Sequence, residues 1–515
     1  MSVHTNPHPR RWKALVVLAV SLLVVSIGNT ILNVALPTIQ EELDASASEL
    51  QWIVDGYLLV FAGLLLTAGG LGDRLGRRRA LIFGLVLFGL ASVAASLATS
   101  SGQLIAARAL MGVGAAAIMP TTLSVITNIF PDDERPKAIA IWSAIAGSGV
   151  AIGPVAGGFL IEAVDWHGIF LINVPIILAC LVGAVALVPE SRDEKSERLD
   201  WIGALVSIAA LTALVWALIE APERGWTSLP ILAAFATAGV LTAGFVGWER
   251  RVAHPLLEVS VFMNRRFSAA SASIAFISFA LMGVLYFLTT YLQSVLGFSA
   301  LDAGVRMLAI AAGIMLAAKS SVRLVARLGT KTVVAAGLTA VALAFVALSG
   351  FQTDTGDLPL ALTLATMGFG MGLTMAPATE AIMGSLPPNR AGIGSAMNDV
   401  TREVAGTLGV AVLGSVLASA YAGAMDGATD GLSSGAAAAA SDSVGAAHEV
   451  AAGIGGQSAA ELVASANQAF VEAMSATASI AAGVALVGAL IAARFLPARA
   501  RSRSGVKPAP QPELG

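Results

Sequence analysis

The chain has 515 residues, of which 56% are apolar and only 12% are charged, and its mean hydropathy is +0.80. Soluble proteins carry about 25% charged residues, so this composition excludes an ordinary soluble fold. The net charge of −3, without a basic cluster of the nucleic-acid-binding type, argues against nucleic-acid binding. The single Cys180 excludes a disulfide framework and a cysteine-based metal site.

Apolar segments of about 20 residues, the length needed to cross a bilayer, recur along almost the whole chain. We predict spans at 14–36, 51–71, 80–99, 104–127, 139–162, 169–188, 200–219, 229–248, 268–291, 303–322, 332–350, 359–383, 395–419 and 473–494. The first has no evident small-residue cleavage site, which indicates a retained span rather than a signal peptide. The sequence therefore predicts an all-α integral membrane protein with fourteen transmembrane helices.

The distribution of positive charge predicts the orientation of these spans, because Lys and Arg near spans stay on the cytoplasmic side. With a cytoplasmic N-terminus, all but four of the 30 Lys and Arg residues fall on that side. The four exceptions are Arg108, Arg224, Arg306 and Arg402. We therefore expect a multi-pass protein of the cytoplasmic membrane with both termini in the cytoplasm.

A glycine-rich and arginine-rich segment, GGLGDRLGRRR at 69–79, falls in the predicted loop between spans 2 and 3. The preference of positive residues for the cytoplasmic side explains its arginines. It does not explain Asp73, an acid at the membrane surface that can meet the positive end of a neighbouring helix. The segment resembles the cytoplasmic loop signature of the major facilitator superfamily. That resemblance implies that it holds two halves of a transporter together in one state, through Gly69, Asp73, Arg74, Gly76 and Arg77.

Two charged residues are expected inside spans 2 and 4. Arg108 stands about one turn inside span 4 and matches the family's fourth-helix arginine associated with proton transfer, although Met111 replaces a commoner glutamine. An interfacial, snorkelling arginine is the alternative. Asp55 enters span 2 to a similar depth, so the two could pair as a proton switch. Asp55 also resembles a second-helix acid of multidrug antiporters and is our first choice for the proton site.

Span 5 contains small residues and a proline at helical spacing, which let helices approach closely and bend the axis. Packing alone is one interpretation of this string. It also resembles the antiporter signature of the superfamily, which is found in exporters more than in importers. The residues concerned are Gly149, Gly153, Pro154, Gly157 and Gly158.

The fourteen-span count narrows the resemblance to the fourteen-helix drug:proton antiporter branch, together with the strings NTILNVALP at 29–37 and WHGIFLINVP at 166–175. Two departures matter. Gly28 stands where the branch usually has an aspartate, and His167 and Gly168 replace a more usual arginine and aromatic residue. The proton stoichiometry of the branch therefore does not transfer, and the remaining acids must carry the coupling.

Those acids concentrate in the second half of the chain. Glu380 lies near the end of span 12, and span 13 contains Asn398, Asp399, Arg402 and Glu403 at helical spacing. Charged residues in an apolar span rarely face lipid. For Asp399 and Arg402 a structural ion pair is an equal alternative, whereas the deeper Glu403 is the better candidate for proton or cation contact. Glu380 could join the same network.

The resemblance predicts a major facilitator fold with two six-helix halves plus two extra central helices. We assign 1–190 to the N-terminal half, 191–266 to the two-helix insertion and 267–494 to the C-terminal half, with a disordered cytoplasmic tail at 495–515. The C-terminal half includes a long extracytoplasmic loop at 420–472. Its Ala, Gly and Ser content predicts disorder or marginal helices, and a tolerated loop rather than a binding module.

No phosphate-binding loop, metal-ligand cluster or nucleophile arrangement occurs in the sequence, so we expect no cofactor, no metal and no enzymatic activity. We expect a monomeric proton-coupled exporter that exchanges amphipathic drug-like molecules for protons by alternating access, and the sequence leaves open whether these molecules are cationic. A dedicated exporter of an endogenous metabolite, lipid or siderophore is the alternative. A membrane enzyme would need a convergent catalytic set and a sensor a soluble output domain, and the sequence offers neither.

Overall fold

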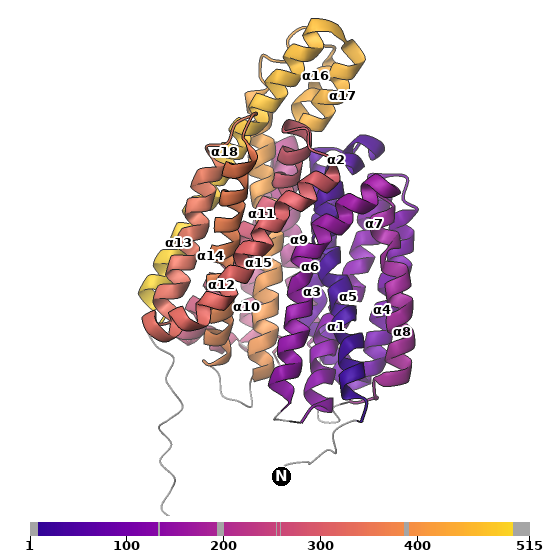
Figure 1. Cartoon of the computed structure of the whole chain (residues 1–515), viewed down its shortest axis with the longest axis vertical. Coiled ribbons are helices and arrows are strands. Elements are labelled where there is room, and N and C mark those ends of the chain that lie inside the picture. The colour runs from indigo at the N-terminus through magenta and orange to yellow at the C-terminus, as the bar shows by residue number, and fades with distance from the viewer. Residues whose placement is uncertain are drawn as a thin grey trace, which may run out of the picture.

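Long helices make up almost all of the chain in the computed structural model of Figure 1, which describes residues 9–131, 134–192, 200–253, 255–257, 259–385 and 391–497. In chain order the elements are α1 (Arg11–Gly28), α2 (Ile31–Leu43), α3 (Ala47–Leu75), α4 (Arg77–Ser96), α5 (Ser101–Ile129), α6 (Arg135–Ala163), α7 (Gly168–Leu171), α8 (Asn173–Leu187), α9 (Trp201–Arg224), α10 (Leu229–Glu249), η1 (Val259–Met263), α11 (Arg265–Thr290), η2 (Tyr291–Val295), α12 (Ala300–Leu328), α13 (Thr330–Leu348), α14 (Asp357–Met383), α15 (Ala391–Ala424), α16 (Ser434–Asp442), α17 (Val444–Ile454) and α18 (Gly456–Phe495). The described residues contain no strand.

The predicted spans agree with these helices. Thirteen helical segments of the described residues are long and apolar enough to cross a membrane. α6, with 29 residues, coincides with the remaining predicted span at 139–162. The all-helical membrane architecture predicted from composition is therefore confirmed. The predicted tail at 495–515 lies almost entirely outside the described residues.

The first predicted span is broken in the middle. α1 ends at Gly28 and α2 begins at Ile31, and between them the Thr30 amide donates to the carbonyl of Ile27 in a tighter turn. A break of this kind frees backbone carbonyls that must find donors, because the bilayer supplies no water. The carbonyl of Gly28 finds such a donor in Arg108.

The helices form two bundles that stand side by side (Figure 1). In the first bundle α5 packs against α3 and α4, and α1 packs against α6 and α8. In the second, α14 packs against α12 and α13, and α15 and α18 pack against α11. The extra helix α9 packs on both α3 and α15, so it covers the seam between the bundles, while α10 packs on α9 and is largely exposed.

The two bundles close on each other at one side of the membrane region, opposite the start of α1 and the end of α18 (Figure 1). We call this the cap side. A Cβ built on Gly158 of α6 would lie 2.5 Å from the carbonyl oxygen of Ala300 in α12. Nearby, the Leu301 amide donates to Glu162 at 3.1 Å, and Gln293 donates to the carbonyl of Val34 at 2.8 Å. Only glycine allows backbones to approach this closely.

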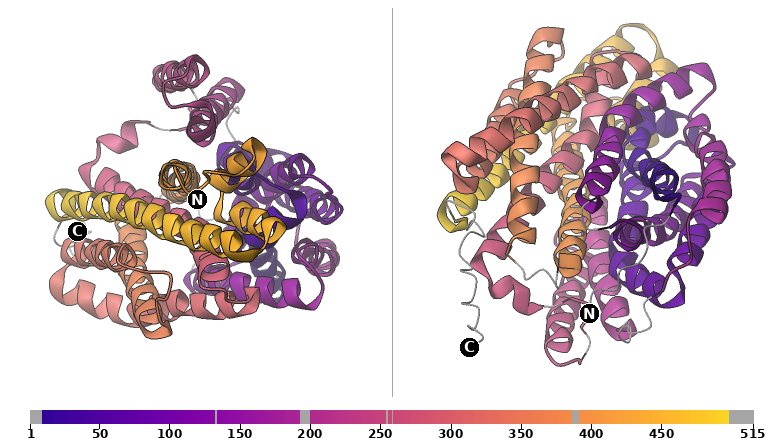
Figure 2. Two further views of the ribbon diagram at one scale, coloured as in Figure 1. Left: turned by 90° about the horizontal axis from the view of Figure 1, so that it is seen from above. Right: turned by 60° about the horizontal axis from the view of Figure 1, so that its bottom comes forward.

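A small helical cap, formed by α16 and α17, stands above this closed side (Figures 1 and 2). It joins the bundles, because the Ala47 amide at the start of α3 donates to Asp442 at 2.9 Å and Gln40 donates to Ser443. Ser433 caps α16 and Ser443 caps α17. The composition of 420–472 is compatible with disorder or marginal helices, and in the structure this segment is mostly helical, with a turn region at 425–433 between α15 and α16.

Replacing Gly158 by leucine should prevent this closure, because the added side chain would meet the backbone of α12. We expect a cysteine at Thr290, which lines a cavity of about 50 Å³ between the bundles, to react faster with a bulky maleimide in Gly158→Leu than in the parent. The measurement uses purified protein with Cys180→Ser.

The matched control is Gly102→Leu, since no atom lies within 4 Å of a Cβ built at Gly102. This control should leave the labelling rate unchanged. If the labelling rate is the same in Gly158→Leu and in the parent, the contact between Gly158 and α12 is not what keeps the cap side closed.

Candidate functional site

Arg108 of α5 is the largest charged side chain buried in the first bundle, with only 1% of its surface exposed. Its Nε donates to the carbonyl of Ile53 at 3.1 Å, and its Nη1 donates to the carbonyl of Gly28 at 3.2 Å. The guanidinium also lies over the ring of Tyr57, 4.2 Å from the centroid. The carbonyl freed by the break between α1 and α2 is thus one of its partners, and a cation–π contact adds to the stabilisation.

The predicted ion pair between Asp55 and Arg108 is not formed in the structure. Asp55 is 0% exposed, and neither carboxylate oxygen has a hydrogen-bond partner among the described residues. The reason is that backbone carbonyls and an aromatic ring already satisfy the guanidinium. Gln51, one helical turn before Asp55 on the same side of α3, instead accepts a long contact of 3.5 Å from Ser415 of α15 in the second bundle. The carboxylate therefore lies near the seam without a compensating cation.

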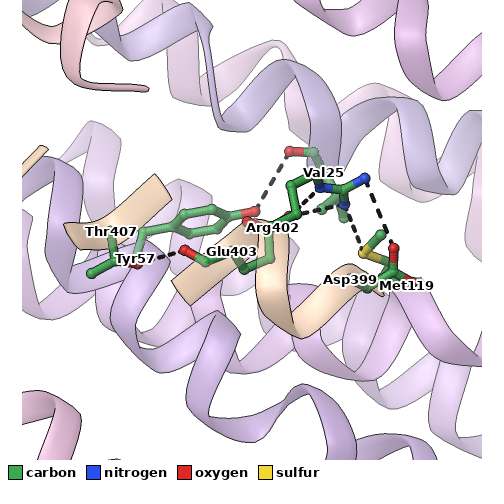
Figure 3. Close-up of polar contacts among 7 residues, drawn as sticks. All are labelled: Val25, Tyr57, Met119, Asp399, Arg402, Glu403 and Thr407. Carbon is green, nitrogen blue, oxygen red and sulfur yellow. Dashed lines mark hydrogen bonds and ion pairs between the residues drawn. The ribbon is translucent and has the colours of Figure 1, made fainter. Parts of the chain in front are cut away.

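The second bundle contributes a compact charged network from α15 (Figure 3). Arg402 donates to Glu403 from Nη2 at 2.9 Å and from Nε at 3.1 Å, and it lies 3.8 Å from Asp399. Glu403 is 5% exposed. The sequence suggested that Arg402 pairs with Asp399 and that Glu403 lies deeper in the span. In the structure Arg402 is closer to Glu403 than to Asp399. One cation is therefore shared by two acids.

This network reaches the first bundle across the seam. Arg402 Nη2 contacts the sulfur of Met119 in α5 at 3.9 Å (Figure 3), and α15 packs on α3, the helix that carries Tyr57. The Tyr57 hydroxyl itself makes a long contact of 3.5 Å with the carbonyl of Val25. The buried charges of the two bundles thus face one region. Tyr57 belongs to this region, but the sequence did not indicate it, because a single tyrosine in a span carries no pattern.

The other acid predicted for the network lies apart from it. Thr379 of α14 donates to Asn398 at 3.3 Å, which links α14 to α15. The next residue, Glu380, is exposed and makes no side-chain hydrogen bond or ion pair with the described residues. Adjacent helical residues point about 100° apart, so the contact of Thr379 directs Glu380 away.

The signature at 69–79 is mostly helical rather than a loop, since α3 continues to Leu75 and the turn is confined to Gly76. Gly76 has a φ of 118°, which favours glycine. Asp73 accepts from Arg77 Nε at 2.7 Å and from Ser124 at 2.9 Å, both within the first bundle. Gly69 packs against Pro120, and Arg74 is exposed. In this conformation Asp73 is engaged inside its own bundle.

The span 5 signature lies where α6 meets its neighbours. Cβ atoms built on Gly149, Gly153 and Gly157 would run into Ser26, Thr30 and Ile31, next to the break between α1 and α2. Thr30 also donates to the carbonyl of Gly149 at 3.1 Å. On the same helix, Gly158 and Pro154 contact α12 of the second bundle. The signature therefore packs the broken helix and closes the cap side at once.

Comparisons with known proteins agree with this architecture. A family model described as Major Facilitator Superfamily matches residues 18–410. The multidrug efflux pump LfrA of Mycolicibacterium smegmatis is 37% identical over 488 residues, which cover 95% of this chain and 96% of LfrA. The tetracenomycin C resistance and export protein of Streptomyces glaucescens is 34% identical, covering 79% of this chain and 76% of its own.

A solved structure gives the same result for the fold. The crystal structure of a bacterial homolog to the human lysosomal transporter Spinster, inward-facing and unoccupied, is 19% identical, covers 94% of this chain and 98% of its own, and has a TM-score of 0.65. The family predicted from the sequence signatures is confirmed by the matched residues and by the relatives. This chain is a member of the Major Facilitator Superfamily.

Proposed function

We propose that this protein is a proton-coupled exporter of amphipathic, cationic drug-like molecules, belonging to the drug:proton antiporter branch of its family. The observation that carries the proposal is the buried, unpartnered carboxylate of Asp55 beside a seam between two bundles. A buried carboxylate without a cation is costly and must bind a proton or a cation. The names of the relatives, among them multidrug efflux pumps, support drugs as the solutes that move.

Coupling follows if proton and solute compete for the same acids. Protonated Asp55 is neutral and tolerates burial, whereas ionised Asp55 attracts an organic cation. On the other bundle, Arg402 compensates one of the two charges of Asp399 and Glu403, so this site also has one negative charge in excess when both acids are ionised. A proton or a cationic solute at either place then shifts the balance between conformations.

Alternating access is the motion that would expose these acids to each side in turn. In this proposal residues 1–190 and 267–494 rock about the buried charges, with 191–266 as the two-helix insertion. The contact that opens and closes is the one between Gly158 of α6 and Ala300 of α12. We place the cap outside the cell and both termini in the cytoplasm, in a monomer. The closed cap side then makes this an inward-facing conformation.

A dedicated exporter of one endogenous compound is the second candidate. It is favoured by relatives named for resistance to single antibiotics, such as the puromycin resistance protein of Streptomyces alboniger, which is 36% identical over 80% of this chain. Efflux of several chemically unrelated dyes would favour the multidrug proposal. Strict selectivity for one compound would favour the dedicated exporter.

Asp55→Asn and Glu403→Gln should each reduce uncoupler-sensitive ethidium efflux from energised cells at least about tenfold, because neither amide can exchange a proton. Each substitution preserves side-chain shape, and expression is checked by immunoblot. Glu461→Gln, which changes an exposed acid of α18, is the matched control and should leave efflux intact. Normal efflux in both variants would refute the site assignment without refuting transport.

Arg108 is proposed as a positioning residue for Asp55, since it holds the carbonyl of Ile53 two residues away. Arg108→Lys keeps the charge but cannot donate in the same fork geometry, so we expect the pH at half-maximal transport to shift and stability to fall by about 1–3 kcal/mol. Leu110→Ala, on the exposed face of the same helix, is the control. Lower stability with an unmoved pH profile would make Arg108 purely structural.

A further inference from the structure

A group of metal-binding side chains lies outside the central site, on the cap side of the first bundle. Glu42 near the end of α2 meets Asp165 and His167 in the connection between α6 and α7, and one ligand atom from each lies within 4.8 Å of the others. The sequence does not reveal this group, because Glu42 lies far along the chain from the other two members. Trp166, the residue between Asp165 and His167, is 124 residues after Glu42. The transport mechanism proposed above does not use any of the three.

A buried tryptophan holds two of the three side chains in place. Trp166 is 0% exposed, and its indole Nε1 donates to Glu42 Oε2 at 2.8 Å. The indole ring also stacks on the His167 ring, with centroids 3.9 Å apart and an interplanar angle of 29°. The same residue therefore fixes a carboxylate and an imidazole, so this is a built arrangement rather than three independent surface side chains.

One carboxylate oxygen of the group has no hydrogen-bond partner. His167 Nδ1 lies 2.7 Å from Asp165 Oδ2, while Asp165 Oδ1 is buried and has no hydrogen-bond partner. Within the described residues neither Asp165 nor Glu42 forms an ion pair with a lysine or arginine. A buried acceptor without a donor calls for an explanation, and a bound cation supplies one.

We propose that Glu42, Asp165 and His167 form a binding site for a divalent transition-metal ion of the Zn²⁺ class. Zn²⁺ accepts imidazole nitrogen and carboxylate oxygen at about 2.0–2.2 Å, so rotations of these side chains bring all three onto one ion. The imidazole favours Zn²⁺ over Ca²⁺ and Mg²⁺, which prefer oxygen alone. The metal takes the place of the hydrogen between Asp165 and His167, and water completes the coordination.

His167 is the departure from the branch pattern that the transport mechanism leaves unexplained. The more usual arginine at this position carries a fixed positive charge and would repel a metal ion, whereas a neutral imidazole is a ligand. The site would join α2 to the connection after α6. Val34 of α2 and Glu162 of α6 are the residues that the second bundle contacts across the cap side. Metal binding therefore stiffens the surface against which the second bundle closes.

The test is isothermal titration of ZnCl₂ into the purified full-length protein after removal of any affinity tag. We expect Glu42→Gln and His167→Phe each to weaken the tight Zn²⁺ site at least about tenfold, since a ligand is lost while shape or ring stacking is kept. Zn²⁺ should also raise the melting temperature of the parent but not of the variants. Titration with CaCl₂ should give no comparable binding.

His448→Asn is the matched control, because His448 contacts Asn467 elsewhere on the cap side and belongs to a different histidine environment. It should bind Zn²⁺ like the parent. Gel filtration and thermal unfolding of both ligand variants without metal verify that they fold. Absence of a tight site in the parent, or equal binding by the parent and the folded Glu42→Gln and His167→Phe variants, would overturn the proposal.

Discussion

The cost of placing charge where water is absent governs the organisation of this protein. Each charged side chain within the bundles needs a partner supplied by the protein, because the bilayer offers none. Arg108 obtains two backbone carbonyls and the face of Tyr57, and Arg402 obtains the carboxylates of Glu403 and Asp399. Asp55 obtains no hydrogen bond from the described residues. This inequality separates the charged side chains that are satisfied within the fold from Asp55, which we propose binds a proton or cation.

The helix break and the glycines make the arrangement of charges possible. The turn between α1 and α2 presents the Gly28 carbonyl to Arg108, and α6 packs on this same break through Gly149 and Gly153. The adjacent Gly158 brings α6 against α12 of the second bundle. One helix thus contacts, through two different faces, both the broken helix that carries an arginine partner and the seam that has to open during transport. Packing of the span 5 signature is consequently connected to the charged centre through direct contacts.

Much of the fold could be predicted from the sequence, because the apolar length needed to cross a bilayer is a strong local constraint. The helical cap was less certain, since its alanine-rich composition gives little hydrophobic contrast, although Ser433 and Ser443 do act as helix caps. The central residues Asp55, Arg108 and Glu403 could be selected because buried charge is expensive. Their partners could not be predicted. Pairing depends on how each helix is rotated and on backbone carbonyls that become available only where a helix breaks. Asp55 and Arg108 were at matching depth, yet the nearer acceptors were Ile53 and Gly28.

The most direct test of the account measures proton movement rather than drug resistance. Purified protein is reconstituted into liposomes that contain ethidium and a membrane-impermeant pH indicator, with no imposed pH gradient. If Asp55 couples the two fluxes, ethidium leaving down its gradient drives protons inward and acidifies the lumen, and Asp55→Asn abolishes this acidification. Ethidium efflux without any change in lumenal pH, in the intact protein, would contradict proton-coupled exchange.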